Sequence, residues 1–269
     1  MKRPVKIALS VISVAAAAVC VFCILYLVQY FRGNTLNDRL RKDVVRTASP
    51  EPLFSSADSQ TETSAPETPG KAFSTVDFDA LRKINDDIYA WIEIPGTNVS
   101  YPVAQNADDD LFYLRRGVDK TYYSSGTIFS QRYNTTTLED PMTVLYGHTN
   151  KIGTMFTELN NFADAIFFDE NRYIYIYTPG EVYEDTIFAA YPHSNDHLLL
   201  CNDFSNPQQF DAYFAGLTDA INSNYRRELF PSSGDKVLTL STCYLNNDLQ
   251  RFLVQGVLTA RYPIDPIEK

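Results

Sequence analysis

The chain has 269 residues, which is enough for one large domain with additional segments or for two small domains. Hydrophobic residues make up 45% of the chain and aromatic residues 13%, so a substantial core can form. The formal net charge of −10 argues against a nucleic-acid partner, because phosphate binding needs a basic face.

The N-terminus predicts a membrane anchor. Residues 1–6 contain three basic side chains and no acidic one, and no charged residue occurs in residues 7–31. That run is long enough for a helix to cross a hydrocarbon core of ~30 Å. A cleaved signal peptide has a shorter apolar run, so an uncleaved anchor is favoured, although Ala15–Ala18 resemble the small residues of a cleavage site. We expect residues 1–6 in the cytoplasm, residues 7–31 across the membrane and the remainder outside.

A linker is expected after the anchor, over residues 32–75. From residue 47 the sequence is rich in Ser, Thr, Pro and Glu and has few large apolar residues. Such a segment cannot bury enough surface to fold, so we predict a disordered extracellular tether that lifts the domain off the membrane. On this interpretation residues 1–75 are dispensable for chemistry, and a chain that begins near Val76 is soluble and active.

The folded domain is expected over residues 76–263, followed by a C-terminal tail at 264–269. Phe78, Leu81, Ile84 and Ile88 recur at helical spacing and predict a helix at the start of this domain. Segments rich in Val, Ile, Tyr, Phe and Thr predict strands at 99–103, 126–129, 142–146, 172–178, 185–191, 236–242 and 251–262. Many strands with short connections indicate a mainly β domain, either a barrel or a sandwich.

One helix interrupts the later strands. Asn206 and Pro207 form a helix start, with a capping side chain followed by proline in the first turn. Helical spacing of apolar residues then continues from Phe210 to Ile221. This helix either covers one opening of a barrel, or walls a substrate groove beside the strand that follows, or does both.

Cys243 is the candidate nucleophile. It ends the apolar strand KVLTLSTC, where a thiol is partly exposed and held rigidly from one side. The alternative is a small buried hydrophobe, which is the usual role of a free cysteine. Cys201 is the other cysteine of the domain, and a disulfide between the two is possible in an oxidising compartment.

His148 and Arg251 are the candidate partners of this thiol. His148 follows the strand TVLY and Gly147, which permits a sharp turn, and an imidazole can give or take a proton near neutral pH. Arg251 begins the strand after Cys243, so a return strand brings both side chains to the same end of the sheet. Its guanidinium can donate hydrogen bonds to developing negative charge. Taken singly, His148 and Arg251 could each be an ordinary surface residue.

The three residues together resemble the signature of the sortases, in which TLSTC is followed by an arginine and preceded by YGH. The class B sortases are the most similar, because NVSYPVAQNADDDLFYL, GTIF, YGHTN and MFTEL also match, as does the helix before the nucleophile strand. The resemblance covers residues 78–262. It implies a closed barrel of about eight strands with an N-terminal helix and a helix inserted before the nucleophile strand.

The resemblance also implies a mechanism. Cys243 would attack the carbonyl that follows a Thr in a sorting motif near the C-terminus of a surface protein, and an amine of a peptidoglycan precursor or a pilin lysine would resolve the thioester. His148 would carry the protons, and Arg251 would hold the motif and its oxyanion. Tyr244, through its backbone N–H, and Ser241 are weaker candidates for the same site. No cofactor is implied, and the expected location is the outer face of a Gram-positive cell membrane.

Two other clusters of residues contain potential metal ligands, and neither predicts a metal site. His193, His197 and Cys201 are spaced as zinc ligands on a helix would be, but the residues between the histidines form helices poorly and no fourth ligand is evident. Asp108–Asp110 lack the spacing of a calcium loop and indicate a solvated turn. We therefore expect no metal.

Two rival functions remain open. One is a secreted cysteine peptidase that hydrolyses its acyl-enzyme, although the papain-like order places the cysteine before the histidine, the reverse of the order here. The other is a non-catalytic, membrane-tethered surface module.

Overall fold

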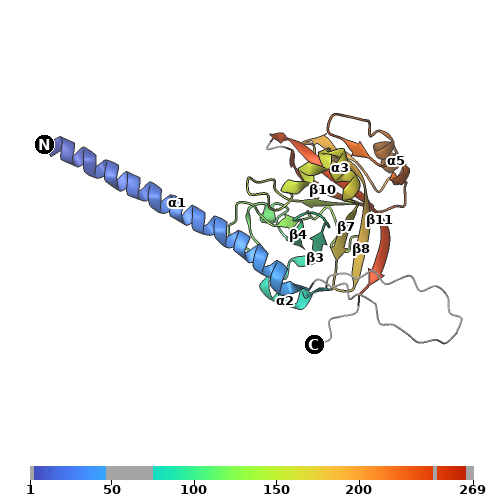
Figure 1. The fold of residues 1–269 in the computed structure, drawn as a ribbon, viewed down its shortest axis with the longest axis horizontal. Helices are drawn as coiled ribbons and strands as arrows, with labels where there is room; N and C mark the ends of the chain where they lie inside the picture. The colour runs from blue at the N-terminus through green and yellow to red at the C-terminus, as the bar shows by residue number, and fades with distance from the viewer. Residues whose placement is uncertain (1–2, 47–74, 245–246, 265–269) are drawn as a thin grey trace, which may run out of the picture.

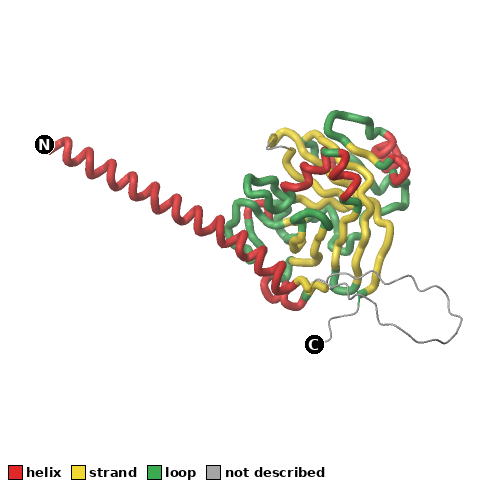
Figure 2. Tube along the Cα trace, viewed as in Figure 1, coloured by secondary structure: helices red, strands yellow, loops and turns green. Residues whose placement is uncertain are grey.

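The computed structural model describes residues 3–46, 75–244 and 247–264, and in it a long helix projects from a β domain (Figures 1 and 2). The elements are α1 (Arg3–Val44), β1 (Val45–Arg46), β2 (Thr75–Val76), α2 (Phe78–Ile84), β3 (Ile88–Glu93), β4 (Ser100–Ala104), η1 (Phe112–Arg115), β5 (Ile128–Phe129), β6 (Met142–Tyr146), η2 (Thr157–Ala163), α3 (Ala165–Glu170), β7 (Tyr173–Tyr177), β8 (Glu181–Ser194), α4 (Leu198–Cys201), α5 (Pro207–Ala215), β9 (Asn224–Tyr225), η3 (Arg227–Leu229), β10 (Val237–Tyr244) and β11 (Asn247–Pro263).

Eight strands close into a barrel, as predicted. Their order is β11-β10-β6-β5-β4-β3-β7-β8, and β8 pairs back to β11 along most of its length. The β10–β6 and β4–β5 pairs are parallel, and the other pairs of the barrel are antiparallel. The short β9 pairs with Ala189 and Ala190 of β8, beyond Thr186, the partner of the first residue of β7. The barrel therefore leaves few strand edges unpaired.

Strand β10 shows how both faces of the barrel wall are used. Leu238 and Leu240 point into the barrel, where they pack with Phe252 and Val254 of β11. Val237 points outward and belongs to a second cluster, which α5 covers with two phenylalanines. Because side chains alternate along a strand, Cys243 lies on the same outer face as Val237.

The first predicted helix is shorter than its periodicity suggested. Helix α2 ends at Ile84, because Asn85 caps it with its backbone N–H and accepts a hydrogen bond from the N–H of Asp87 on its side chain. Ile88, expected on the helix, instead begins strand β3. This strand was missed because both of its faces are buried, which removes the alternation that reveals a strand.

The inserted helix is also shorter than predicted. Asn206 caps α5 through its side chain and Pro207 opens it, as expected, but the helix ends at Ala215 with Gly216 as its C-cap. Ile221, predicted to lie on its apolar face, is 86% exposed. The apolar spacing beyond Gly216 therefore does not reflect a helix.

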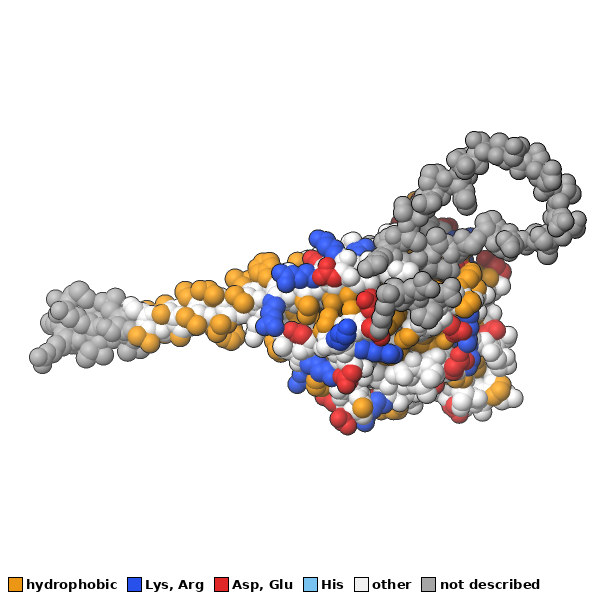
Figure 3. All heavy atoms as spheres, turned by 90° about the horizontal axis from the view of Figure 1, so that it is seen from below, with side chains coloured by type: hydrophobic (Ala, Val, Ile, Leu, Met, Phe, Trp, Pro, Cys, Tyr) orange, Lys and Arg blue, Asp and Glu red, His pale blue; other side chains and the backbone are white. Residues whose placement is uncertain are grey.

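The structure assigns the first part of the expected linker to helix α1. Residues 32–44 belong to α1, and Leu40 and Val44 are each only 4% exposed, because they pack against the domain. Residues 47–74, the Ser- and Pro-rich part of that prediction, lie outside the described residues. In the described part of the chain, the helix over Ile12–Val44 is long and apolar enough by length and composition to cross a membrane. Figure 3 shows hydrophobic side chains along its projecting part and basic ones where it meets the domain.

Candidate active site

Strand register brings the three predicted site residues to one end of the barrel. In the parallel β6–β10 pair, Tyr146 lies opposite Ser241, so His148 and Cys243, each two residues further along, reach the same level. In the antiparallel β10–β11 pair, Arg251 lies directly opposite Cys243. Because lateral neighbours in a sheet point to the same face, Cys243 and its two neighbours form a row on the outer face of the barrel.

The thiol of Cys243 is held by Arg251. The distance between Arg251 Nη1 and Cys243 Sγ is 3.0 Å, and both side chains are partly buried. Cys201 and Cys243 are both free, so the disulfide that the sequence left open does not form here. The guanidinium is therefore placed to donate a hydrogen bond to the sulfur, and then to an oxygen that develops charge beside it.

His148 is oriented by the backbone of η1, which is distant in the sequence. Its Nε2 lies 2.8 Å from the carbonyl oxygen of Leu114. A carbonyl only accepts hydrogen bonds, so this contact places a proton on Nε2 of the neutral ring. Gly147 precedes the histidine where a Cβ would come within 2.5 Å of the Ile128 side chain and 2.6 Å of Phe156, so only glycine fits.

A hydrogen-bond network that the sequence did not reveal ties the histidine side of the site to the nucleophile. Thr149 Oγ1 donates to the carbonyl oxygen of Cys243 at 2.8 Å and lies 2.9 Å from Thr242 Oγ1. Asn160 Nδ2 donates to Thr149 Oγ1 at 3.2 Å and reaches the same carbonyl at 3.4 Å. Thr149, the residue after His148, therefore holds the backbone of Cys243 in place. A threonine next to the histidine was the only available signal.

These residues lie in a cleft of about 470 Å³, within the range of small-ligand sites. One wall is formed by η1 and its flank, and the other by the segment from the end of β8 to the start of α4. The lining residues of the two walls are Leu111, Leu114 and Arg115, and His193, Asn195, Asp196, His197 and Leu198. No described residue of α5 lines the cleft, so α5 covers the barrel wall, and α4 with its preceding loop takes the groove-forming role.

The weaker candidates are divided between the two faces of the sheet. Ser241 lines the cleft, and its carbonyl accepts the backbone N–H of Gly147 at 3.1 Å. The Tyr244 side chain points into the barrel, where it stacks on Phe252 with ring centroids 5.4 Å apart. The β10–β11 register shifts between Cys243 and Tyr244. Ser241 therefore stays a candidate for the site, whereas Tyr244 can contribute only its backbone N–H and not its side chain.

The residues proposed as zinc ligands do not converge. His197 Nε2 lies 2.6 Å from Gln131 Oε1 in the cleft, and His193 Nδ1 contacts the carbonyl oxygen of Ser194. Cys201 is exposed and lines a different surface depression. In the ranges that the structure describes, no group of three or more His, Cys, Asp or Glu side chains is arranged to hold a metal ion.

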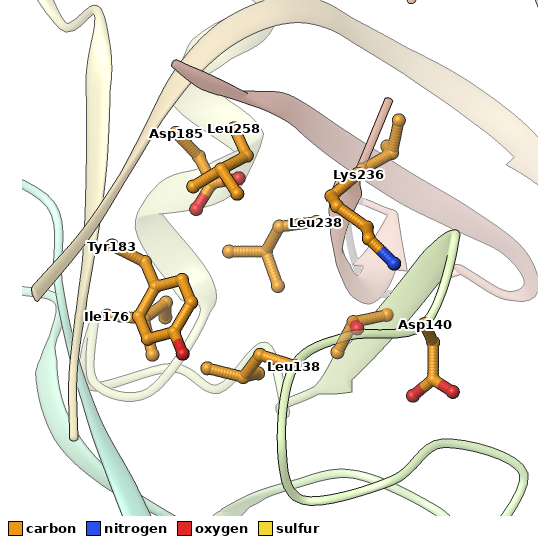
Figure 4. A pocket seen from close by; sticks show the side chains of 10 residues that line it. Leu138, Asp140, Ile176, Tyr183, Asp185, Lys236, Leu238 and Leu258 are labelled. Atoms are coloured by element: carbon orange, nitrogen blue, oxygen red, sulfur yellow. The ribbon is translucent and has the colours of Figure 1, made fainter. Parts of the chain in front are cut away.

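A second cavity lies apart from this cleft and holds only about 20 Å³. Figure 4 shows its lining, in which Asp185 stands among apolar side chains that include Ile176, Leu238 and Leu258. None of the three predicted site residues reaches it. Its volume suits a single water molecule rather than a substrate.

Comparison with known proteins agrees with this architecture. The family model of the sortase domain matches residues 92–259. Sortase B of Listeria monocytogenes is 31% identical over 184 residues, which cover 67% of this chain and 73% of that protein. The structure of Clostridium perfringens sortase B has a TM-score of 0.60 at 29% identity, covering 68% of this chain and 100% of that chain. A class B sortase of Streptococcus pyogenes involved in pilus biogenesis has a TM-score of 0.59 at 29% identity, covering 68% of this chain and 98% of that chain.

Proposed function

The chain belongs to the sortase family of cysteine transpeptidases and is similar to its class B members, and we propose that it transfers an acyl group from a protein sorting motif to an amine through a thioester on Cys243. The observation that carries this proposal is the 3.0 Å contact between Arg251 Nη1 and Cys243 Sγ, beside His148 and at the base of an open cleft. This geometry supports the proposal, because the candidate nucleophile, proton carrier and oxyanion donor lie on one face of the barrel.

In the first half of the reaction, Cys243 Sγ attacks the carbonyl carbon that follows a threonine of the substrate. The thiol proton passes to His148, and Arg251 donates to the oxyanion of the tetrahedral intermediate. The C–N bond then breaks, and the leaving amine takes the proton from the imidazolium of His148. The product of this half is an acyl-enzyme with a thioester on Cys243.

In the second half, an incoming amine attacks the thioester and loses a proton to His148. The new amide forms, the C–S bond breaks, and the thiolate regains its proton from the imidazolium. The Leu114 contact supports this shuttle, because it fixes the orientation of the imidazole in the cleft. The backbone N–H of Tyr244 is proposed as a second oxyanion donor.

The proposed substrates are surface proteins that carry the motif near their C-termini. The acceptor is an amine of a peptidoglycan precursor or a pilin lysine; the relative that is involved in pilus biogenesis supports considering the second. The helix over Ile12–Val44 supports anchoring in the cell membrane. We place residues 7–31 across that membrane, with residues 1–6 in the cytoplasm and the catalytic domain outside, on a Gram-positive cell.

Incubation with a library of Thr-containing peptides and a set of amines tests this function. Cleavage after Thr together with a peptide–amine product is expected, and Cys243→Ala should abolish both without a change in circular dichroism. Cys201→Ala is the matched control, because that thiol is free but lies outside the cleft, and it should keep full activity. Cleavage that never yields the amine product would instead indicate a peptidase. A Cys243→Ala variant with wild-type transfer would overturn the assignment.

A further inference from the structure

Helix α1 continues beyond the proposed membrane span and packs on the catalytic domain. At Gly33 an added Cβ would lie 2.2 Å from the ring of Tyr123. The backbone of the helix therefore packs directly against this buried ring. Further along, Leu40 and Val44 join a buried cluster with residues of α2, β3 and β4. With Leu36, which packs against the same cluster, these positions are spaced by three or four residues and form one face of the helix.

Polar contacts flank this face on either side of Gly33. Arg32 pairs with Asp119 at 3.3 Å, and the hydroxyl of Tyr123 donates to the side-chain oxygen of Asn34. Each lies within a turn of Gly33. Because an α-helix rises ~1.5 Å per residue, the contact from Gly33 to Val44 extends for about 16 Å along the axis. This is enough to fix the direction of α1 relative to the domain.

The chain then closes on itself. Val45 pairs with Val76, Arg46 pairs with Thr75, and the N–H of Asp77 donates to the carbonyl oxygen of Val44 at 3.1 Å. Arg46 and Thr75, which flank the segment 47–74, are therefore held side by side. A segment whose ends are fixed together adds nothing to the distance between the anchor and the domain.

The part of the domain that α1 contacts, which includes Tyr123 and Asp119, is connected to the active site. The loop that contacts α1 through Tyr123 and Asp119 is bound to η1 by the hydrogen bond from the N–H of Tyr123 to the carbonyl oxygen of Arg115, at 3.0 Å. The residue before Arg115 is Leu114, whose carbonyl oxygen orients His148. One side of this unit thus faces the helix, and the other side lines the catalytic cleft.

We propose that residues 33–44 of α1 are a docking surface for the catalytic domain, so that the domain sits at a fixed height directly on the outer membrane surface and the length of the segment 47–74 does not set that height. The proposal rests on the membrane anchoring proposed above, but it does not depend on the chemistry. It replaces the expectation of a mobile tether with a rigid strut, because the anchoring helix and the docking helix are the same helix.

Energy transfer from the active site to the bilayer tests this directly. Cys20, Cys23 and Cys201 are replaced by serine, a fluorescent maleimide is attached to Cys243, and the full chain is reconstituted in vesicles that carry acceptor-labelled lipid headgroups. Inserting roughly 20 Gly and Ser residues between Thr61 and Glu62 should leave the transfer efficiency unchanged, whereas a tether of that length would extend the reach measurably.

Gly33→Leu is the disrupting variant, and Gly180→Leu is its matched control, because a Cβ at Gly180 meets no atom within 4 Å. Gly33→Leu should lower the transfer efficiency and make it sensitive to the insertion, while Gly180→Leu should match the parent chain. Circular dichroism and vesicle flotation confirm folding and insertion. A parent chain whose transfer falls with the insertion, or a Gly33→Leu chain that matches the parent, would overturn the proposal. Since Cys243 is blocked, neither result bears on the transpeptidase function.

Discussion

Substitution of Arg251 tests its proposed role as the oxyanion donor. Arg251→Lys keeps the positive charge but loses the planar fork, so we expect at least about a tenfold loss in kcat/KM. Arg251→Ala should lose about 10²–10³, which is typical of removing one oxyanion donor. His148→Ala should be at least as damaging, because the proposed mechanism routes both proton transfers through this imidazole. Steady-state cleavage of a fluorogenic sorting peptide measures these losses. A folded Arg251→Ala enzyme with near wild-type kinetics would remove this residue from the site.

Thr149 is predicted to act by positioning rather than by touching substrate. Thr149→Val keeps the shape of the side chain but removes the hydroxyl that binds the Cys243 carbonyl. We expect kcat to fall about tenfold, because small misplacements of reacting groups are costly, while KM stays nearly constant. Thr149→Ser should restore most of the activity. If the valine variant lost thermal stability with kcat unchanged, the network would be structural only.

Sequence alone could predict which three residues lie together at this site, but not the contacts that hold them there. Cys243, His148 and Arg251 were identifiable because each ends or begins a strand and because their order matches a family. Leu114 could not be identified, since it contributes only a carbonyl oxygen from 34 residues away. Any residue type can supply a backbone carbonyl oxygen, so such a contact cannot be recognised from the amino-acid sequence.

At the scale of elements, predictions succeeded where one face of a strand is polar or the run is strongly β-branched. Strands β6, β7, β8, β10 and β11 all fall on predicted segments. Strand β3 was missed because burial on both faces removes periodicity, and α2 and α5 were drawn too long because apolar residues beyond their caps continue the helical spacing by chance. Local patterns do not reveal which residues the tertiary core will cover.

Strand β8 carries a buried carboxyl whose ionisation opposes folding. Burial raises the pKa of Asp185 well above its ordinary value of 3.8, an effect that nearby Glu184 adds to and Arg261 partly offsets. Above pH 3.8 the folded state therefore binds more protons at this residue than the unfolded state does, so its contribution to stability falls as the pH rises.

Asp185→Asn should accordingly raise the thermal midpoint at pH 7, by about 2 °C or more. The difference from the wild type should shrink as the pH approaches 3.8, where the unfolded carboxyl also becomes protonated. Thermal unfolding followed by circular dichroism between pH 4 and pH 8 measures both effects. A variant that is less stable than the wild type at pH 7 would show that the carboxylate has a partner worth more than its burial penalty.

For the whole molecule, the docked helix alters what a truncation should do. A chain that begins near Val76 was predicted from sequence to be soluble and active, and the site itself lies within the remaining residues. The structure adds that this chain loses the packing of Leu40 and Val44, each of which is almost fully buried. Burying such a side chain contributes roughly 1.5–3 kcal/mol.

We therefore expect the chain starting at Val76 to cleave peptide but to unfold about 5 °C or more below a chain starting at Arg32. Differential scanning calorimetry of the two chains makes the comparison. Equal midpoints would mean that residues 32–46 contribute nothing to the stability of the domain, and loss of folding would place the domain boundary further toward the N-terminus.

Intact-protein mass spectrometry during turnover shows whether catalysis passes through a thioester on Cys243. With a cleavable Thr-containing peptide and no amine, we expect one acyl group per chain, located on Cys243 by fragmentation. Adding an amine acceptor should discharge it at the rate at which the amide product appears, and Cys201→Ala should behave identically. Transfer to the amine at an undiminished rate, with no adduct on Cys243 at any time and with Cys243→Ala still active, would contradict the account.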